Sequence, residues 1–426
     1  MRTLLLILLV SSTGFARKTV QAGEIDAQLL RGASPRQSCQ WNLLKELGWR
    51  AERSTKTGFS ISPQLACHSD SFVIENPSGL ILKISEKTSP LELSRLQSEF
   101  EKLLTSKETF CGYKHLVSKA AVLAAEKLVA NPDFDFKTLQ WGFIQFGTTR
   151  DFPKQAWKNT WIPRKLRYVP KSPPSRAIEQ FYFGRVRSEC AVGLQAAEMA
   201  MTYELFGALG FDRSFSSREF TMGTYASIND DEQIFHGEDL EDRNVIDQEG
   251  KFLPAKGVTG LIGYSGYLEN VYGEDFLDNK ANRGENFLIL RASEAAAQAI
   301  ARAGSFSEMN DLMKQVQKLV EQSENPKREA KEIYADRFST MPNENKSHVH
   351  TEVDRLLSRP EFTDLLLFVQ SSRHNEKIRE LRYHVKRLLK LNPRTPYKIR
   401  LYRSPIDTQI FQRFTAERMD SCLVSR

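Results

Sequence analysis

Apolar residues along the chain recur at two spacings, one typical of helices and one typical of strands. Helical spacing predicts a helix over residues 90–106 and a second over residues 108–130, which is rich in Ala and ends at Asn131-Pro132. A third helix is expected to begin at Glu189-Cys190 and to stop at Gly207 or Gly210, since glycine favours a helix end. Short strands are expected at residues 80–84, 220–226, 261–268 and 286–290.

The pattern changes along the rest of the chain. Residues 133–168 are rich in aromatic residues and broken by prolines, which favours short strands and loops. Residues 171–174 are predicted to be a stiff connector, because the consecutive prolines favour an extended backbone. Beyond Ala301 charged helices follow, so we place a domain boundary near residue 303. These helices are expected over residues 305–322, 327–338, 351–370 and 376–391.

The only long apolar run lies at the start. Leu4 to Val10 follow a short basic segment, and small-residue cleavage sites follow after Ala16 and Ala22. The run is shorter than the roughly 20 apolar residues that span a bilayer. An uncleaved anchor or a buried helix is the alternative to a secretory signal peptide. We interpret it as a signal peptide and expect a secreted or periplasmic protein. The expected parts are residues 1–22 (signal peptide), 23–106 (N-terminal region), 107–303 (core) and 304–426 (charged helical region).

Composition excludes several classes of protein. Of 426 residues, 40% are hydrophobic and 27% charged, which is ordinary globular usage and argues against wholesale disorder. The 23 Gly and 17 Pro follow no fixed period, so a collagen-like chain is excluded. No repeat of 20–50 residues is present, which excludes solenoids and propellers.

The cysteines become informative if the protein is exported. There are five, and because exported thiols tend to pair, an odd count leaves at least one free or reactive. The sequence does not determine the pairing. No Cys or His spacing suggests zinc, so neither a metal nor a cofactor is expected. His348 and His350 look like part of a solvated turn. The cysteines are Cys39, Cys67, Cys111, Cys190 and Cys422.

The formal net charge of +7 is unevenly distributed. From Thr351 to the end there are 16 Lys and Arg against 9 Asp and Glu, and 16 − 9 = 7, so the rest of the chain is balanced. A basic patch of this kind binds nucleic acid, anionic lipid or cell-wall polymer. We favour a solvated helix face, with contact to a cell-wall or other anionic polymer as the alternative, and expect no nucleic-acid partner outside the cytoplasm. Its densest part includes Arg382, Lys386, Arg387 and Lys390.

Cys190 is the first candidate for chemistry. A thiol at a helix start meets unpaired backbone N–H groups and the positive end of the helix dipole, and both favour the thiolate. The adjacent Glu189 is an acceptor that could hold or return a proton. The alternative is a packed cysteine in an Ala-rich helix, since free cysteine is among the most buried residue types.

Two short motifs frame the region around Cys190: Glu-Cys-Ala at residues 189–191 and Gly-Glu-Asn at residues 284–286. In their order and spacing, these motifs resemble the bacterial spore-coat type of protein-glutamine gamma-glutamyltransferase, a transglutaminase family. The resemblance covers about residues 107–300. Supporting segments are Pro-Pro-Ser-Arg-Ala-Ile at residues 173–178, Leu-Ile-Gly at 261–263, Tyr-Leu-Glu-Asn at 267–270 and the helix around 115–128.

The resemblance implies a fold, an activity and three catalytic residues. The fold is a mixed α/β (α+β) core related to papain-like and cell-wall-amidase folds, with a helix-borne Cys packed on a small antiparallel sheet. The activity is formation of isopeptide cross-links between protein Gln and Lys side chains. Cys190 is implied as the nucleophile, Glu285 as the base and Glu189 as its support. A carboxylate accepts a thiol proton if its pKa is raised by burial or a like charge.

The chain departs from the family pattern in several places. Tyr264 stands where the family has Asp, and Asn282 replaces a Trp. Residues 291–303 lack the His that follows the corresponding family strand, and the N-terminal apolar run and the C-terminal region have no counterpart. The missing His puts a full papain-like triad in doubt, whereas the cysteine–glutamate pair is retained.

Two other functions remain open. With water as the acceptor, the same nucleophile gives a cysteine amidase or peptidase that acts on cell wall or protein. If Cys190 is buried or disulfide-bonded, the protein is a non-catalytic adhesion or wall-binding protein. The favoured prediction is an exported transglutaminase-like acyltransferase.

Overall fold

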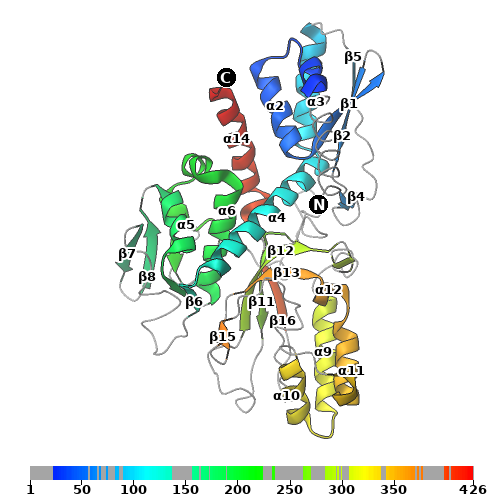
Figure 1. Ribbon diagram of the computed structural model, residues 1–426, viewed down its shortest axis with the longest axis vertical. Helices are drawn as coiled ribbons and strands as arrows, with labels where there is room; N and C mark the ends of the chain where they lie inside the picture. The colour runs from blue at the N-terminus through cyan, green and yellow to red at the C-terminus, as the bar shows by residue number, and fades with distance from the viewer. Residues whose placement is uncertain are drawn as a thin grey trace, which may run out of the picture. The chain divides into compact units, whose positions relative to one another are not determined.

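A computed structural model provides the structure of the chain, shown in Figure 1. Within the part it describes, the chain is a mixture of helices and small, mainly antiparallel sheets, as expected for the α+β class. The described residues are 23–55, 58–64, 67–68, 73–74, 82–85, 90–136, 156–162, 165–171, 173–188, 190–223, 233–235, 262–269, 284–293, 295–296, 299, 307–336, 342–369, 372–373, 376–377, 398–402 and 404–425. The expected signal peptide and the basic residues 382–390 lie outside them.

The chain divides into two compact units. The first comprises Met1–Tyr113 together with Thr415–Arg426, and the second comprises Lys114–Phe414. The first unit is therefore assembled from both ends of the sequence. Among the described helices, none has the length and apolar character needed to cross a membrane.

The first unit contains a three-stranded antiparallel sheet in the order β1-β2-β5. Ser34 and Gln37 form a capping box that fixes the start of α2, and Pro35 at the first helical position favours the same start. The fully buried rings of Trp41 and Phe100 stack between α2 and α3, with centroids 5.8 Å apart. The elements are α2 (Pro35–Glu46), β1 (Trp49–Thr55), β2 (Gly58–Pro63), β3 (Cys67–His68), β4 (Val73–Ile74), β5 (Leu82–Ser85), α3 (Pro90–Leu104) and the first turns of α4 (Lys107–Ala130).

Gly112 permits a close backbone approach in this unit. A Cβ built on it would lie 1.8 Å from the carbonyl oxygen of Leu47, at the end of α2. The Gly112→Ala variant is therefore expected to lose about 3 kcal/mol or more of stability, because α2 and α4 must separate. Urea unfolding of the purified protein measures this. Gly23→Ala adds the same methyl group in open space and should stay within about 1 kcal/mol of wild type; equal losses would contradict the steric argument.

The second unit is organised around a four-stranded antiparallel sheet in the order β13-β12-β11-β16. Its strands β13 and β16 lie in the C-terminal part of the chain, which sequence analysis assigned to a helical region. The strands are β11 (Ser265–Glu269), β12 (Gly284–Ala292), β13 (Leu365–Phe368) and β16 (Lys398–Tyr402).

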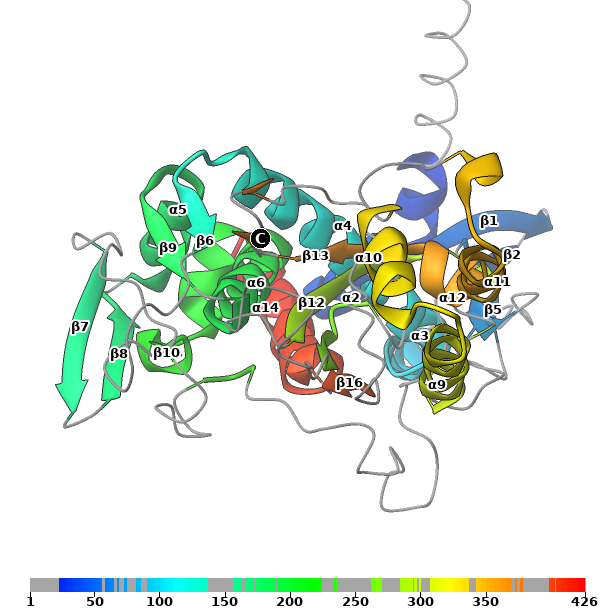
Figure 2. The same ribbon diagram turned by 90° about the horizontal axis from the view of Figure 1, so that it is seen from below.

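Smaller sheets and helices complete the second unit. β7 and β8 form a hairpin, visible in Figure 2, to which β10 adds a third strand. β6 and β9 pair in parallel. The elements are β6 (Phe134–Phe136), β7 (Trp157–Ile162), β8 (Lys165–Pro170), α5 (Pro174–Phe183), β9 (Val186–Ser188), α6 (Cys190–Ser214), η2 (Ser217–Glu219), β10 (Met222–Gly223), β14 (Ser372–Arg373), β15 (Glu376–Lys377), η5 (Pro405–Asp407) and the first residues of α14 (Gln409–Val424), whose residues from Thr415 onward belong to the first unit.

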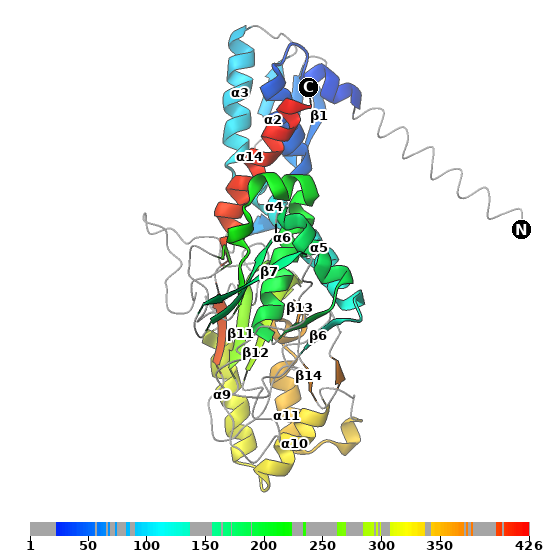
Figure 3. The ribbon, with the colours of Figure 1, turned by 90° about the vertical axis from the view of Figure 1, so that its left-hand side faces the viewer.

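A group of helices stands between β12 and β13 in the sequence. α9, α10 and α11 contact one another, and Figure 3 shows α9 beside α11. Their amphipathic patterns predicted two of them to within two residues at each end. The helices are α9 (Ser307–Glu321), α10 (Pro326–Asp336), α11 (His348–Leu357) and α12 (Pro360–Thr363), with the short η4 (Asn343–Asn345).

Four sequence expectations are wrong. The helix predicted over residues 376–391 has the strand β15 (Glu376–Lys377) at its start, and its other residues lie outside the described part of the chain. The helix predicted over residues 351–370 ends at Leu357, and Leu365–Phe368 form β13, because this apolar run is long enough for a buried strand. Pro173 and Pro174 are the N-cap and first residue of α5 rather than a connector, since proline is well tolerated there. His348 and His350 begin α11, and His350 is fully buried.

Candidate active site

Cys190 is the first residue of α6. The preceding strand β9 ends at Ser188, where its parallel partner β6 also ends at Phe136. A run rich in Ala, Leu and Met then favours a long helix, which is buried along most of its length. In general, the first backbone N–H groups of a helix have no partner within the helix and the helix dipole is positive there, so a thiolate is favoured at such a position. Glu189 and the side chain of Cys190 lie outside what the structure describes.

Glu285 is the second residue of β12. It pairs with Leu268 of β11, so it lies near one end of the central sheet. Helix α6 contacts β12 directly. The helix that carries Cys190 and the strand that carries Glu285 are therefore packed neighbours, as predicted, although the Glu285 side chain is not among those described.

Two contacts fix the direction of α6 relative to β11. The Sδ atom of Met201 lies 3.5 Å from the position that a Cβ on Gly263 would occupy. Glu198, which is three residues before Met201 in the helix, shares a side-chain hydrogen bond with Ser265. Ser265 is two residues after Gly263 in the sequence. Helix and strand thus run in opposite directions, and the start of α6 points toward the end of β11.

Cys190 and Glu285 lie at similar distances along the helix and the sheet from the Glu198–Ser265 contact. Cys190 is eight residues before Glu198, which is about 12 Å of helix. Leu268 is three residues after Ser265, which is about 10 Å of strand, and Leu268 is the partner of Glu285. Cys190 also shares the helical stripe of Met201, since eleven residues are three turns. The backbone geometry is therefore compatible with a Cys190–Glu285 pair.

Glu198 is a buried carboxyl group that sequence analysis missed. Its residue is 2% exposed, and burial raises the pKa of the carboxyl to about 8, while the Ser265 hydrogen bond opposes this increase. No charged group among the described residues offsets the burial. Glu198 is therefore predominantly protonated at pH 7. Its position within an otherwise apolar run of α6 was the available signal.

A second buried polar cluster joins Lys114, Tyr264 and Asp407. The Lys114 ammonium donates to Asp407 and, at 2.6 Å, to the carbonyl oxygen of Ile262, while the Tyr264 hydroxyl donates to Asp407. Burial lowers the pKa of Lys114, and Asp407 opposes this effect. A lysine on the apolar stripe of α4 was a visible signal. Its partner 293 residues away was not predictable from the sequence.

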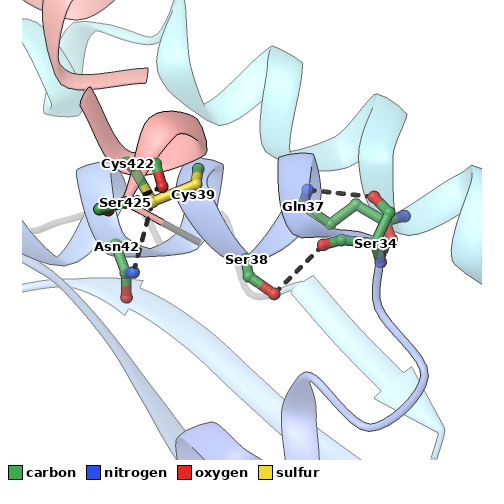
Figure 4. Close-up of a disulfide and its surroundings, with 7 residues drawn as sticks. All are labelled: Ser34, Gln37, Ser38, Cys39, Asn42, Cys422 and Ser425. Carbon is green, nitrogen blue, oxygen red and sulfur yellow. Dashed lines mark hydrogen bonds between the residues drawn. A yellow bond between two sulfur atoms is a disulfide. The ribbon is translucent and has the colours of Figure 1, made fainter. Parts of the chain in front are cut away.

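Two disulfides involve the described cysteines. Cys39 of α2 and Cys422 of α14 are joined across 383 residues, as Figure 4 shows, and Asn42 lies beside the bond with its Nδ2 4.0 Å from the Cys422 sulfur. Cys111 is also disulfide-bonded, to a cysteine whose side chain is not described. By elimination, the candidates for this partner are Cys67 and Cys190.

The other polar groups that the structure describes do not form a metal centre. Within the described ranges, no group of three or more His, Cys, Asp and Glu side chains is placed to hold a metal ion. His115 on α4 is partly buried, and this burial, together with Lys119, lowers its pKa. Searches of protein-family models, curated proteins and solved structures found no match to this chain.

Proposed function

We propose that the chain is an exported protein-glutamine gamma-glutamyltransferase with a papain-like arrangement of its catalytic core. The observation that carries the proposal is the packing of α6, which begins at Cys190, on β12, which carries Glu285 near the same end. The Cys39–Cys422 disulfide supports export, because such bonds persist in oxidising compartments.

The proposed reaction passes through a thioester. Glu285 accepts the thiol proton of Cys190, and the thiolate attacks the carboxamide carbon of a protein Gln. The C–N bond breaks and ammonia leaves with a proton. A neutral Lys amine then attacks the thioester, which forms the isopeptide bond and returns the thiol. Glu189 is proposed to tune the acidity of the pair as a second carboxylate.

The Cys190→Ala variant is expected to abolish incorporation of a fluorescent primary amine into a Gln-bearing protein, because it removes the nucleophile. The Cys67→Ala/Cys111→Ala double variant is the control, because it removes sulfur elsewhere without leaving an unpaired thiol, and it should keep the activity. Circular dichroism of both variants verifies the fold. Retained incorporation by Cys190→Ala contradicts the assignment, and conversion of Gln to Glu without amine incorporation favours the amidase.

The second disulfide provides an independent test. Alkylation of the unreduced protein with iodoacetamide, followed by peptide mapping, identifies the cysteine that is not in a disulfide. The proposal requires alkylation at Cys190 and a bond between Cys67 and Cys111. A Cys111–Cys190 bond would instead favour a non-catalytic adhesion or wall-binding protein, since the nucleophile would be absent.

A further inference from the structure

The buried cluster of Lys114, Tyr264 and Asp407 lies in the second unit. The Lys114 side chain is 0% exposed and that of Asp407 is 2% exposed, while Tyr264 is also buried. Lys114 belongs to α4, Tyr264 precedes β11 and Asp407 ends η5. Three segments far apart in the sequence thus meet at one reactive amine and one carboxyl group.

Burial of the Lys114–Asp407 ion pair opposes folding, because both charges lose their hydration. Each buried ion has a desolvation penalty of several kcal/mol, which mutual attraction offsets only with good geometry and further hydrogen bonds. A neutral amide between the same two side chains would remove both charges. Its N–H would keep the Ile262 carbonyl oxygen as acceptor, and its oxygen would keep the Tyr264 hydroxyl as donor. The surrounding partners therefore suit an amide.

We propose that Lys114 and Asp407 condense to an amide bond inside the folded chain, with Tyr264 as the group that polarises the carboxyl. A proton passes from the ammonium to the carboxylate within the pair. The amine nitrogen attacks Cγ of Asp407, the new C–N bond forms, the C–O bond to the hydroxyl breaks, and one water molecule leaves. No oxidant, cofactor or second protein takes part.

The environment provides the three requirements of this reaction. Burial lowers the pKa of Lys114, which favours the neutral amine that attacks. The Tyr264 hydroxyl donates to Asp407 and stabilises negative charge that develops on oxygen during the attack. The fold holds amine and carboxyl in contact, and such positioning is worth effective concentrations of about 10⁵–10⁸ M.

The mass of the full-length protein tests the proposal. After reduction, the chain should be lighter by one water molecule than its own sequence predicts. A tryptic digest should contain a branched peptide that joins Lys114 to Asp407, with no cleavage after Lys114. A full mass, or a water loss confined to an Asp407 succinimide without a branched peptide, overturns the proposal. These measurements use the wild-type chain and do not depend on a variant that folds.

Variants then assign the roles. Lys114→Met should restore the full mass, whereas Lys119→Met, an exposed lysine on the same helix, should keep the water loss. Tyr264→Phe removes only the hydroxyl and should slow bond formation by about 10²-fold or more, as loss of one oxyanion donor does in enzymes. The rate of bond formation is measured as the loss of mass with time after refolding. Equal rates in Tyr264→Phe and wild type would overturn the role of Tyr264.

Discussion

The Glu285→Gln variant is expected to incorporate amine about 10²–10⁴ times more slowly than wild type, the usual contribution of a general base. Gln keeps the shape and most hydrogen bonds of Glu, but it does not accept the Cys190 proton. Residues 291–303 contain no His that could replace it. Rates should be measured against pH, because loss of the base also removes its titration from the profile.

Glu269→Gln is the matched control for this variant. Glu269 is at the end of β11 and pairs with Gly284, the neighbour of Glu285, so it tests for a nonspecific effect of charge at this end of the sheet. It should react at nearly the wild-type rate.

The Glu189→Gln variant should reduce the rate of amine incorporation less than Glu285→Gln does. The double variant should lose less rate than the product of the two single losses, since the effects of coupled groups are non-additive. An unchanged rate in Glu285→Gln would contradict the assignment of Glu285 as the base.

Glu198→Gln is expected to increase the free energy of unfolding by about 3 kcal/mol at pH 7. The unfolded carboxyl titrates near its ordinary pKa of 4.5, whereas the folded one titrates at about 8. Below pH 4.5 both states are protonated and the group has no effect. Between these values only the folded state holds the proton, so wild-type stability decreases by about 1.4 kcal/mol per pH unit. Above pH 8 the carboxyl is ionised in both states, and the loss of stability caused by Glu198 becomes constant.

Urea unfolding at several pH values from 5 to 8 measures this effect. The difference between Glu198→Gln and wild type should grow with pH over that range. Glu204→Gln on the same helix is the control, because Glu204 accepts from Lys127 at 2.7 Å and from Tyr182 at 2.8 Å. This variant should gain nothing or lose stability. A Glu198→Gln protein that is less stable than wild type at pH 7 would show that the carboxyl has a charged partner.

The elements that the sequence predicted well are those with long, uninterrupted periodicity. Residues 108–130 gave the expected helix α4 and the start of α6 was placed at Cys190, because both have many apolar positions at helical spacing. The strand Leu365–Phe368 was missed because a four-residue apolar run carries no period. Its assignment depends on pairing with β12, which is a tertiary interaction.

The candidate site was predictable only in part, for a similar reason. Local pattern placed Cys190 at a helix start and Glu285 directly before a strand expected over residues 286–290, whereas Glu285 is the second residue of β12. The burial of Glu198 against Ser265 and the Lys114–Asp407 contact depend on how distant segments pack, and no local pattern encodes these partners. The occurrence of Glu198 and Lys114 as lone polar residues within apolar stripes was a visible signal, but it was not used to predict a site and it does not reveal their roles.

The closure of the first unit by residues 415–426 has a consequence for the order of folding during synthesis. Cys39 leaves the ribosome nearly four hundred residues before Cys422, its disulfide partner. During that interval the nascent first unit lacks its last helical segment, while Cys67 and Cys111 are already present. Domains generally fold from the N-terminus as the chain emerges. Here we expect the N-terminal residues to complete their folding last. Disulfides that form early with Cys67 or Cys111 would then rearrange over seconds to hours unless an isomerase assists.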